Sequence, residues 1–162
     1  MPVTEGGLTM VIPPNCIATK FDGADHGLSH CMKAVDFVIE TPGALLFIEF
    51  KDPDAGTVET RAAWTKELSN GRIDNELKTK FRDTWIYMHA SGKVNKPINY
   101  LVLIALSNLS TEALSARTSS LKRQIPIEGP NGPWTNPLLA GCAVHNIESW
   151  NRNYQQLTIV RD

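Results

Sequence analysis

The chain has 162 residues and a formal net charge of −1, with 42% hydrophobic and 20% charged residues. This composition is ordinary for a globular protein, and we expect one domain, residues 1–162, with a sizeable core. The low net charge excludes a polycation that binds nucleic acid by charge alone. The sequence has no apolar run of membrane-spanning length and no basic-then-apolar signal sequence, and its three cysteines lack CxxC spacing. We therefore expect a reduced, cytoplasmic setting.

The first 33 residues give the weakest structural signals. Glycines and prolines interrupt them at positions 6, 7, 13, 14, 23 and 27, and only residues 28–33 suit a helix. His26 and His30 lie four residues apart, with Cys31 next, which superficially resembles a zinc-binding face. No second ligand pair follows at a suitable spacing. We therefore expect a polar segment near the next element, with His30 lining any site there.

A β-hairpin is predicted over residues 34–53, which read AVDFVIETPGALLFIEFKDP, two apolar runs around a Thr-Pro-Gly-Ala turn. If the hairpin is symmetric about its Pro-Gly pair, Asp36 lies directly opposite Glu49. Side chains alternate along a strand, so Lys51 points to the same face as Glu49. Two carboxylates and an ammonium then meet on one face, although Asp, Glu and Lys are all depleted in strands.

Helix and strand patterns alternate after the hairpin. A loop at residues 52–56 leads into a helical region, broken near Asn70 and Gly71, with an apolar stripe at helical spacing: Ile73, Leu77, Phe81, Trp85 and Met88. Residues 99–106 form a continuous apolar run, which is typical of a strand buried on both faces. Together these segments predict a strand, a crossover helix and a second, parallel strand.

The remaining residues predict a second helix and two late strands. Ser107 and Ser110 are candidate caps for a helix over about residues 110–124, whose expected inward residues are Ala113, Leu114, Ala116 and Leu121. A loop with four prolines covers residues 125–137. Short strands are expected at residues 143–147 and 156–160, with a turn of helix at residues 148–153 between them.

The hairpin cluster suits metal-assisted hydrolysis of a phosphodiester. Facing carboxylates bind a hard divalent cation such as Mg²⁺ or Mn²⁺, which stabilises developing charge and supplies hydroxide near neutral pH. A nearby lysine can orient the attacking water or neutralise developing charge. The structural alternative is a cross-strand salt bridge of Asp36 or Glu49 with Lys51. We favour the functional interpretation because both acids and the lysine fall in one register.

This arrangement resembles the PD-(D/E)xK nuclease superfamily, which has the restriction-endonuclease-like fold. The residues that carry the resemblance are Asp36 and the triplet Glu49-Phe50-Lys51. The residue before the family's aspartate is often proline, whereas here it is Val35. The resemblance implies that Asp36, Glu49 and the carbonyl of Phe50 bind metal and that Lys51 supports the nucleophile.

The order of elements strengthens the resemblance over about residues 34–125. It implies an α/β protein with a three-layer fold, in which a central mixed β-sheet is flanked by helices. The family usually has a helix before the hairpin that often bears a glutamate. Residues 28–33 contain none, so the third metal ligand is left open.

Charge is distributed unevenly along the chain. Residues 1–60 carry a balance of −6, whereas residues 61–96 carry +4. The basic helical region is therefore expected to contact phosphates beside the acidic hairpin. Lys78 and Arg82 lie four residues apart on one helix face, and we expect them to be the best backbone contacts. The alternative for each lysine or arginine is that it simply solvates an outer helix face.

Two classes of function fit these observations. The first is a Mg²⁺-dependent nuclease, a metal-binding and DNA-binding hydrolase that acts on DNA or, as the less favoured substrate, RNA, either as an endonuclease or as an exonuclease. It would act alone, as a homodimer or within a larger defence or repair complex. The second is a non-catalytic subunit of the same fold that binds nucleic acid or protein. The first is favoured because both acids and the lysine are retained.

Overall fold

A five-stranded mixed sheet forms the centre of the computed structural model, which describes residues 1–23 and 27–162. Its strand order is β3-β4-β5-β6-β7. Strands β3, β4 and β5 are antiparallel to their neighbours among these three, whereas β6 pairs in parallel with β5 and β7 pairs in parallel with β6. Their bounds are β3 Ile17–Lys20, β4 Phe37–Glu40, β5 Leu45–Lys51, β6 Ile98–Ile104 and β7 Gly141–His145. The predicted mixed α/β class is therefore confirmed.

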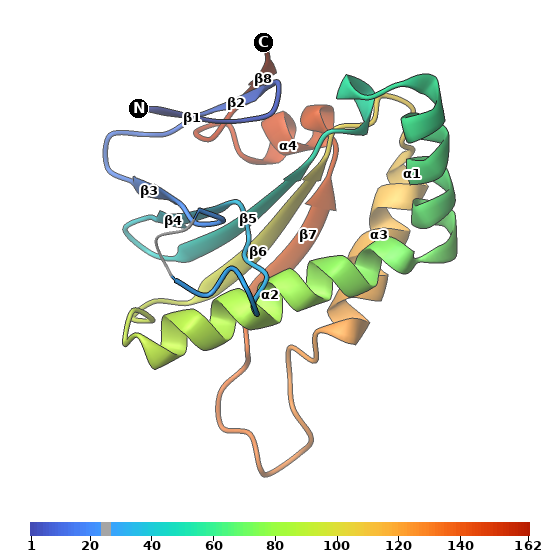
Figure 1. The fold of residues 1–162 in the computed structure, drawn as a ribbon. Helices are drawn as coiled ribbons and strands as arrows, with labels where there is room; N and C mark the ends of the chain where they lie inside the picture. Colours follow the sequence, from blue (N-terminus) through green and yellow to red (C-terminus); the bar gives the residue numbers. More distant parts are fainter. Residues whose placement is uncertain (24–26) are drawn as a thin grey trace.

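Different elements cover the two faces of this sheet (Figure 1). One face packs against the helices α1 Val58–Asn70, α2 Arg72–Ala90 and α3 Thr111–Gln124. The other face packs against α4 Ile147–Asn153 and a three-stranded antiparallel sheet of β1 Pro2–Glu5, β2 Leu8–Val11 and β8 Ile159–Arg161. Helices therefore lie on both faces of the sheet, and the three-stranded sheet beside α4 is an element that the sequence did not predict.

Strand β5 shows how the two faces are assigned. Leu45 and Phe47 pack into the core beneath the helices, while Leu46, Ile48 and Phe50 pack into the opposite core, around the buried Trp150. Side chains alternate along a strand. The next side chains in this alternation, Glu49 and Lys51, therefore lie on the helical face. They are charged, whereas Leu45 and Phe47 before them are apolar.

The hairpin has the predicted register. Phe37 pairs with Ile48 and Glu40 with Leu45 across β4 and β5, and the backbone N–H of Thr41 donates to the carbonyl of Ala44 to close the turn. Asp36 immediately precedes β4, so continuing this register by one residue brings it opposite Glu49. The predicted register is confirmed.

The two helices after the hairpin are separated where the sequence predicted. Gly71 ends α1 and begins α2 with φ of 74°. The predicted stripe on α2 is buried except for Trp85, which is half-buried and donates its indole N–H to the carbonyl of Leu138 at 3.1 Å. A short 3-10 turn, η2 Pro53–Ala55, links β5 to α1.

Helix α3 differs from its prediction in the face that it buries. Ser110 caps it as expected, and Leu114 and Leu121 are buried. Ala113 is only half-buried and Ala116 is exposed, so both were wrongly expected inside. The helix instead turns Arg117 toward α2, where its Nη1 forms an ion pair at 2.7 Å with Oδ2 of the buried Asp74.

The N-terminal segment is the largest departure from the expected structure. Among its described residues, 28–33 form a turn and coil rather than a helix, while β1, β2 and β3 were not anticipated. These strands are only four residues each, which is too short for a clear periodic signal. The C-terminal strand β8 pairs with β2 rather than with the main sheet. No helix in the described ranges is long and apolar enough to span a bilayer.

We predict that Gly71→Ala destabilises the protein by about 1 kcal/mol or more, because an L-residue with left-handed φ costs roughly 1–2 kcal/mol. A Cβ there would also lie 3.2 Å from Nη1 of Arg117. Gly43→Ala is the control, since the φ of Gly43 is not positive and a Cβ there would meet nothing within 4 Å. Urea unfolding measures both. Equal midpoints for the two variants would contradict the prediction.

Candidate functional site

Glu49 is the centre of a charged cluster between the main sheet and α2. Its carboxylate is on the helical face of β5 and is fully buried, with 0% exposure. Oε1 lies 2.8 Å from Nζ of Lys51 and 2.6 Å from Nζ of Lys80. Oε2 is also buried and has no hydrogen-bond partner among the described residues. An ionised group in this position is costly to bury unless every oxygen finds a partner.

Asp36 provides the second carboxylate and is 4% exposed. Its Oδ2 accepts a 2.6 Å hydrogen bond from the backbone N–H of Phe50, and its Oδ1 lies 3.6 Å from Nζ of Lys80. Burial and the nearby Glu49 carboxylate raise the pKa of Asp36 to about 7, against the opposing effects of Lys80 and of the Phe50 N–H. Near neutral pH this carboxyl is therefore poised between its two protonation states.

Lys51 lies where the hairpin alternation predicted it, beside Glu49. Its ammonium also forms a 2.7 Å ion pair with Glu76 of α2, whose side chain is 46% exposed. Burial alone would lower the pKa of Lys51, but the Glu49 and Glu76 carboxylates hold it above its ordinary value. Lys51 therefore stays protonated and acts as a fixed positive charge at the open side of the cluster.

Lys80 is a member of the cluster that the sequence did not identify. It lies on α2, one helical turn after Glu76, and contacts both hairpin carboxylates. Glu76 and Lys80 are at i and i+4, a spacing visible in the sequence, and both flank the apolar stripe of α2. The sequence does not show which side of that stripe faces the strand end, so this signal alone could not have selected them.

Lys78 and Arg82 are not brought to the cluster. Each of them is two residues from Lys80, which places it about 200° around the helix from Lys80, since each residue turns an α-helix by about 100°. Lys78 is half-buried and Arg82 is exposed. Their contact with nucleic acid stays a prediction, and so does the metal-binding role of the Phe50 carbonyl.

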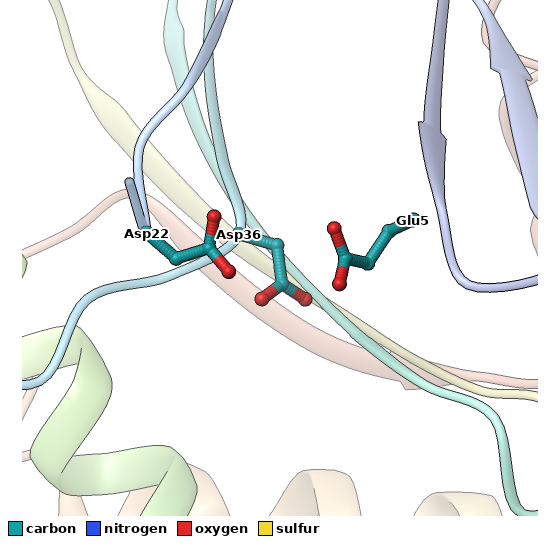
Figure 2. A group of neighbouring side chains, drawn as sticks. All are labelled: Glu5, Asp22 and Asp36. Atoms are coloured by element: carbon teal, nitrogen blue, oxygen red, sulfur yellow. The ribbon is translucent and has the colours of Figure 1, made fainter. Parts of the chain in front are cut away.

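A further acidic group borders Asp36. One carboxylate oxygen each from Glu5, Asp22 and Asp36 lies within 4.8 Å of the others. Figure 2 shows the Asp36 carboxylate between the other two, with Glu5 reaching in from β1 and Asp22 from the loop after β3. Oε2 of Glu5 is also paired with Lys20 at 2.7 Å. The sequence gave no signal for Glu5, because β1 was not predicted and lies far from Asp36 along the chain.

The His and Cys pattern that superficially resembles a zinc-binding face does not form a cluster in the described part of the chain. His30 and Cys31 are both exposed there, and neither joins a group of three potential metal ligands. His26 lies outside the described residues. The expectation that His30 lines the site is likewise unsupported by any described contact.

The carboxylate cluster has the donor chemistry that a hard divalent cation requires. Mg²⁺ and Mn²⁺ prefer oxygen ligands. Asp36 and Glu49 both offer carboxylate oxygens, and one oxygen of each contacts the ammonium of Lys80. Oε2 of Glu49 is a further oxygen, and no donor among residues 1–23 and 27–162 satisfies it. These residues therefore fit a divalent cation.

Comparison of the chain with protein-family models, with curated proteins and with solved structures found no match. The functional interpretation therefore depends on the geometry of the site.

We predict that the unfolding free energy falls as pH rises from about 5 to about 7 in the presence of a chelator. The folded chain keeps the Asp36 proton up to a pKa of about 7, whereas the ordinary value is 3.8. Between these values the folded state binds more protons than the unfolded state, so stability falls with rising pH and levels off above the folded pKa. Asp36→Asn should have a smaller pH slope and should be more stable than wild type at about pH 8. Thermal unfolding across the pH series measures this. Parallel profiles for the two proteins would contradict it.

Proposed function

We propose that this chain is a divalent-metal-dependent nuclease that hydrolyses phosphodiester bonds, with DNA as its substrate. The observation that carries the proposal is the fully buried Glu49 carboxylate, whose Oε2 has no partner, beside Asp36 and two lysines. Burying this charge is costly, and the fold gains nothing from it that an apolar residue on β5 would not supply.

A purely structural ion-pair network explains the cluster less well. Such networks usually satisfy each buried oxygen, because an unpaired buried acceptor costs about 1–3 kcal/mol. Here Oε1 of Glu49 takes two ammonium groups while Oε2 takes none. Raised carboxyl pKa values are also common at functional sites, and that of Asp36 is raised to about 7.

Each residue of the cluster has a distinct proposed role. Asp36 and Glu49 would hold the cation, with Glu5 as the further carboxylate nearest to Asp36. A bound Mg²⁺ or Mn²⁺ would supply Lewis-acid stabilisation of the phosphate charge and a more acidic water. Lys51, kept protonated by Glu49 and Glu76, would orient the attacking water and neutralise charge on the phosphate oxygens.

The topology supports a restriction-endonuclease-like fold. An antiparallel hairpin, β4 and β5, is followed by helices, by the parallel strand β6, by α3 and by the parallel strand β7. This is the order of elements that the resemblance to PD-(D/E)xK nucleases implied. The carboxylates lie at the end of β5 where α2 crosses the sheet, and the partly exposed Glu76 borders them through its ion pair with Lys51.

We predict that the purified protein cleaves DNA in the presence of Mg²⁺ or Mn²⁺ and not with a chelator. Asp36→Asn and Glu49→Gln should abolish cleavage while the fold is retained, because each removes a cation ligand. Glu40→Gln is the control, since Glu40 lies at the turn end of the same hairpin and forms only a surface ion pair with Lys96. Assays should use circular and linear duplexes, single strands and RNA. Cleavage by Asp36→Asn at the wild-type rate would overturn the proposal.

We predict that Lys51→Ala lowers the cleavage rate by about 10²- to 10³-fold, the usual cost of losing one preorganised charge-stabilising group. Cation binding should be retained, because Lys51 is not a ligand. Lys51→Arg should restore little activity, because a planar guanidinium does not reproduce a compact ammonium. Lys96→Ala is the control. Single-turnover kinetics measure the cleavage rate, and calorimetry measures cation binding. A wild-type rate for Lys51→Ala would reduce Lys51 to an ion-pair partner.

A further inference from the structure

Lys80 contacts both of the carboxylates that are proposed to share a cation. Its Nζ lies 2.6 Å from Oε1 of Glu49 and 3.6 Å from Oδ1 of Asp36. Among the ion pairs of the described residues, no other ammonium contacts both acids. A divalent cation held jointly by these two carboxylates, including the unpartnered Oε2 of Glu49, would lie close to this ammonium. The ammonium and the cation therefore compete for the same two carboxylates.

We propose that Lys80 is an internal counter-cation that exchanges with the divalent ion: Lys80 bridges Asp36 and Glu49 until the ion binds, and its released ammonium then contacts a substrate phosphate. This inference rests on the proposed function and adds to it the control of cation entry and a further substrate contact. It also assigns a role to a residue that neither the hairpin motif nor the resemblance includes.

The charges of the cluster support exchange rather than simple addition of the ion. Asp36, Glu49 and Glu76 face Lys51 and Lys80, so with Asp36 ionised these five groups leave a single net negative charge. Of the two further acids beside Asp36, Glu5 is balanced by its ion pair with Lys20 and Asp22 is exposed to solvent, so neither changes this count for the buried groups. A divalent ion added beside both lysines would leave an excess positive charge in a largely buried site, which is unfavourable at low dielectric. Removal of one ammonium from the carboxylates restores the balance.

Lys80 rather than Lys51 is the lysine that leaves. Lys51 has a second ion pair, at 2.7 Å to Glu76, which does not depend on the two cation ligands. Within the described part of the chain, the ion pairs of Lys80 are with Glu49 and Asp36 alone, the groups that the divalent ion would engage. A lysine has a flexible four-carbon stem, and the side chain of Lys80 is already 15% exposed. Its ammonium can therefore swing outward without moving α2.

The released ammonium would be well placed for substrate. Lys80 and Lys51 both start from the cluster, so a phosphate positioned at the cation would be near both. Ammonium-to-phosphate contacts are charge-assisted and favourable. Cation binding would thereby free the ammonium that Glu49 and Asp36 otherwise hold, so that it can contact a phosphate. Binding of the ion would therefore strengthen binding of nucleic acid.

The first test is calorimetric titration of Mg²⁺ and Mn²⁺ into wild type, Lys80→Met and the control Lys78→Met, at about pH 8. Lys80→Met keeps the length of the stem and removes the competing charge. It should bind the ion about tenfold more tightly than wild type, which corresponds to about 1.4 kcal/mol of competition. Lys78 lies on the same helix without contact to either acid, so Lys78→Met should bind as wild type does.

The outcomes of this titration separate the inference from the proposed function. If wild type binds the ion and Lys80→Met binds it equally or more weakly, the exchange is wrong and the metal site stands. If neither protein binds Mg²⁺ or Mn²⁺, the metal site is wrong and both proposals fall. Tighter binding by Lys80→Met alone supports both.

A second measurement uses the wild-type protein, so it stands even if Lys80→Met does not fold. Limited acetylation followed by mass spectrometry reports the reactivity of each lysine. Addition of Mg²⁺ should raise the modification rate of Lys80 several-fold, because its ammonium leaves the two carboxylates, and should leave the rate of Lys78 unchanged. An unchanged Lys80 rate under conditions where calorimetry shows the ion bound would overturn the inference.

Discussion

The burial of the Glu49 carboxylate on an otherwise apolar strand is the constraint around which the rest of the site is arranged. Its neighbours on the helical face of the sheet, such as Phe47 and Val102, are fully buried and apolar. A lone carboxylate there would be protonated or would open the packing. Two lysines from different elements prevent this, because both place their ammonium groups on the same oxygen. The helix α2 therefore cannot be moved or rotated without exposing or unpairing Glu49.

Stability for this arrangement comes from elsewhere in the molecule. The cores on the two faces of the sheet are continuous and apolar, and the second is closed by the fully buried Trp150, whose indole N–H donates to the carbonyl of Leu157 at 2.7 Å. The charged cluster around Glu49 lies at one end of β5, and a separate buried acid, Asp74, pairs with Arg117 on the helices. Functional sites are places where stability is given up for reactivity.

The hairpin half of the site was predictable, and the helical half was not. A Pro-Gly turn between two apolar runs sets the register, and the strand period of two then places Asp36, Glu49 and Lys51 without further information. Lys80 depends on how α2 is rotated against the sheet, which is decided by packing of side chains from several elements. The spacing of Lys78 and Arg82 shows only that they share one face of the helix. Lys80, two residues from each, is the one that faces the acids. Glu5 depends on a strand pairing that four-residue segments do not specify.

Strand β5 explains why the charges meet at this place and nowhere else along the hairpin. It pairs antiparallel with β4 on one side and parallel with β6 on the other. Its carboxyl end therefore lies beside the start of β4, where Asp36 stands, and leads through η2 into the helices that return across the same face. Asp36 lies just before β4, Glu49 and Lys51 come from the end of β5, and Lys80 comes from α2. These side chains meet where the two strand ends and the helix lie together. At the opposite end of the hairpin the turn leaves Glu40 and Lys96 partly exposed, and the same residue types form an ordinary surface ion pair there.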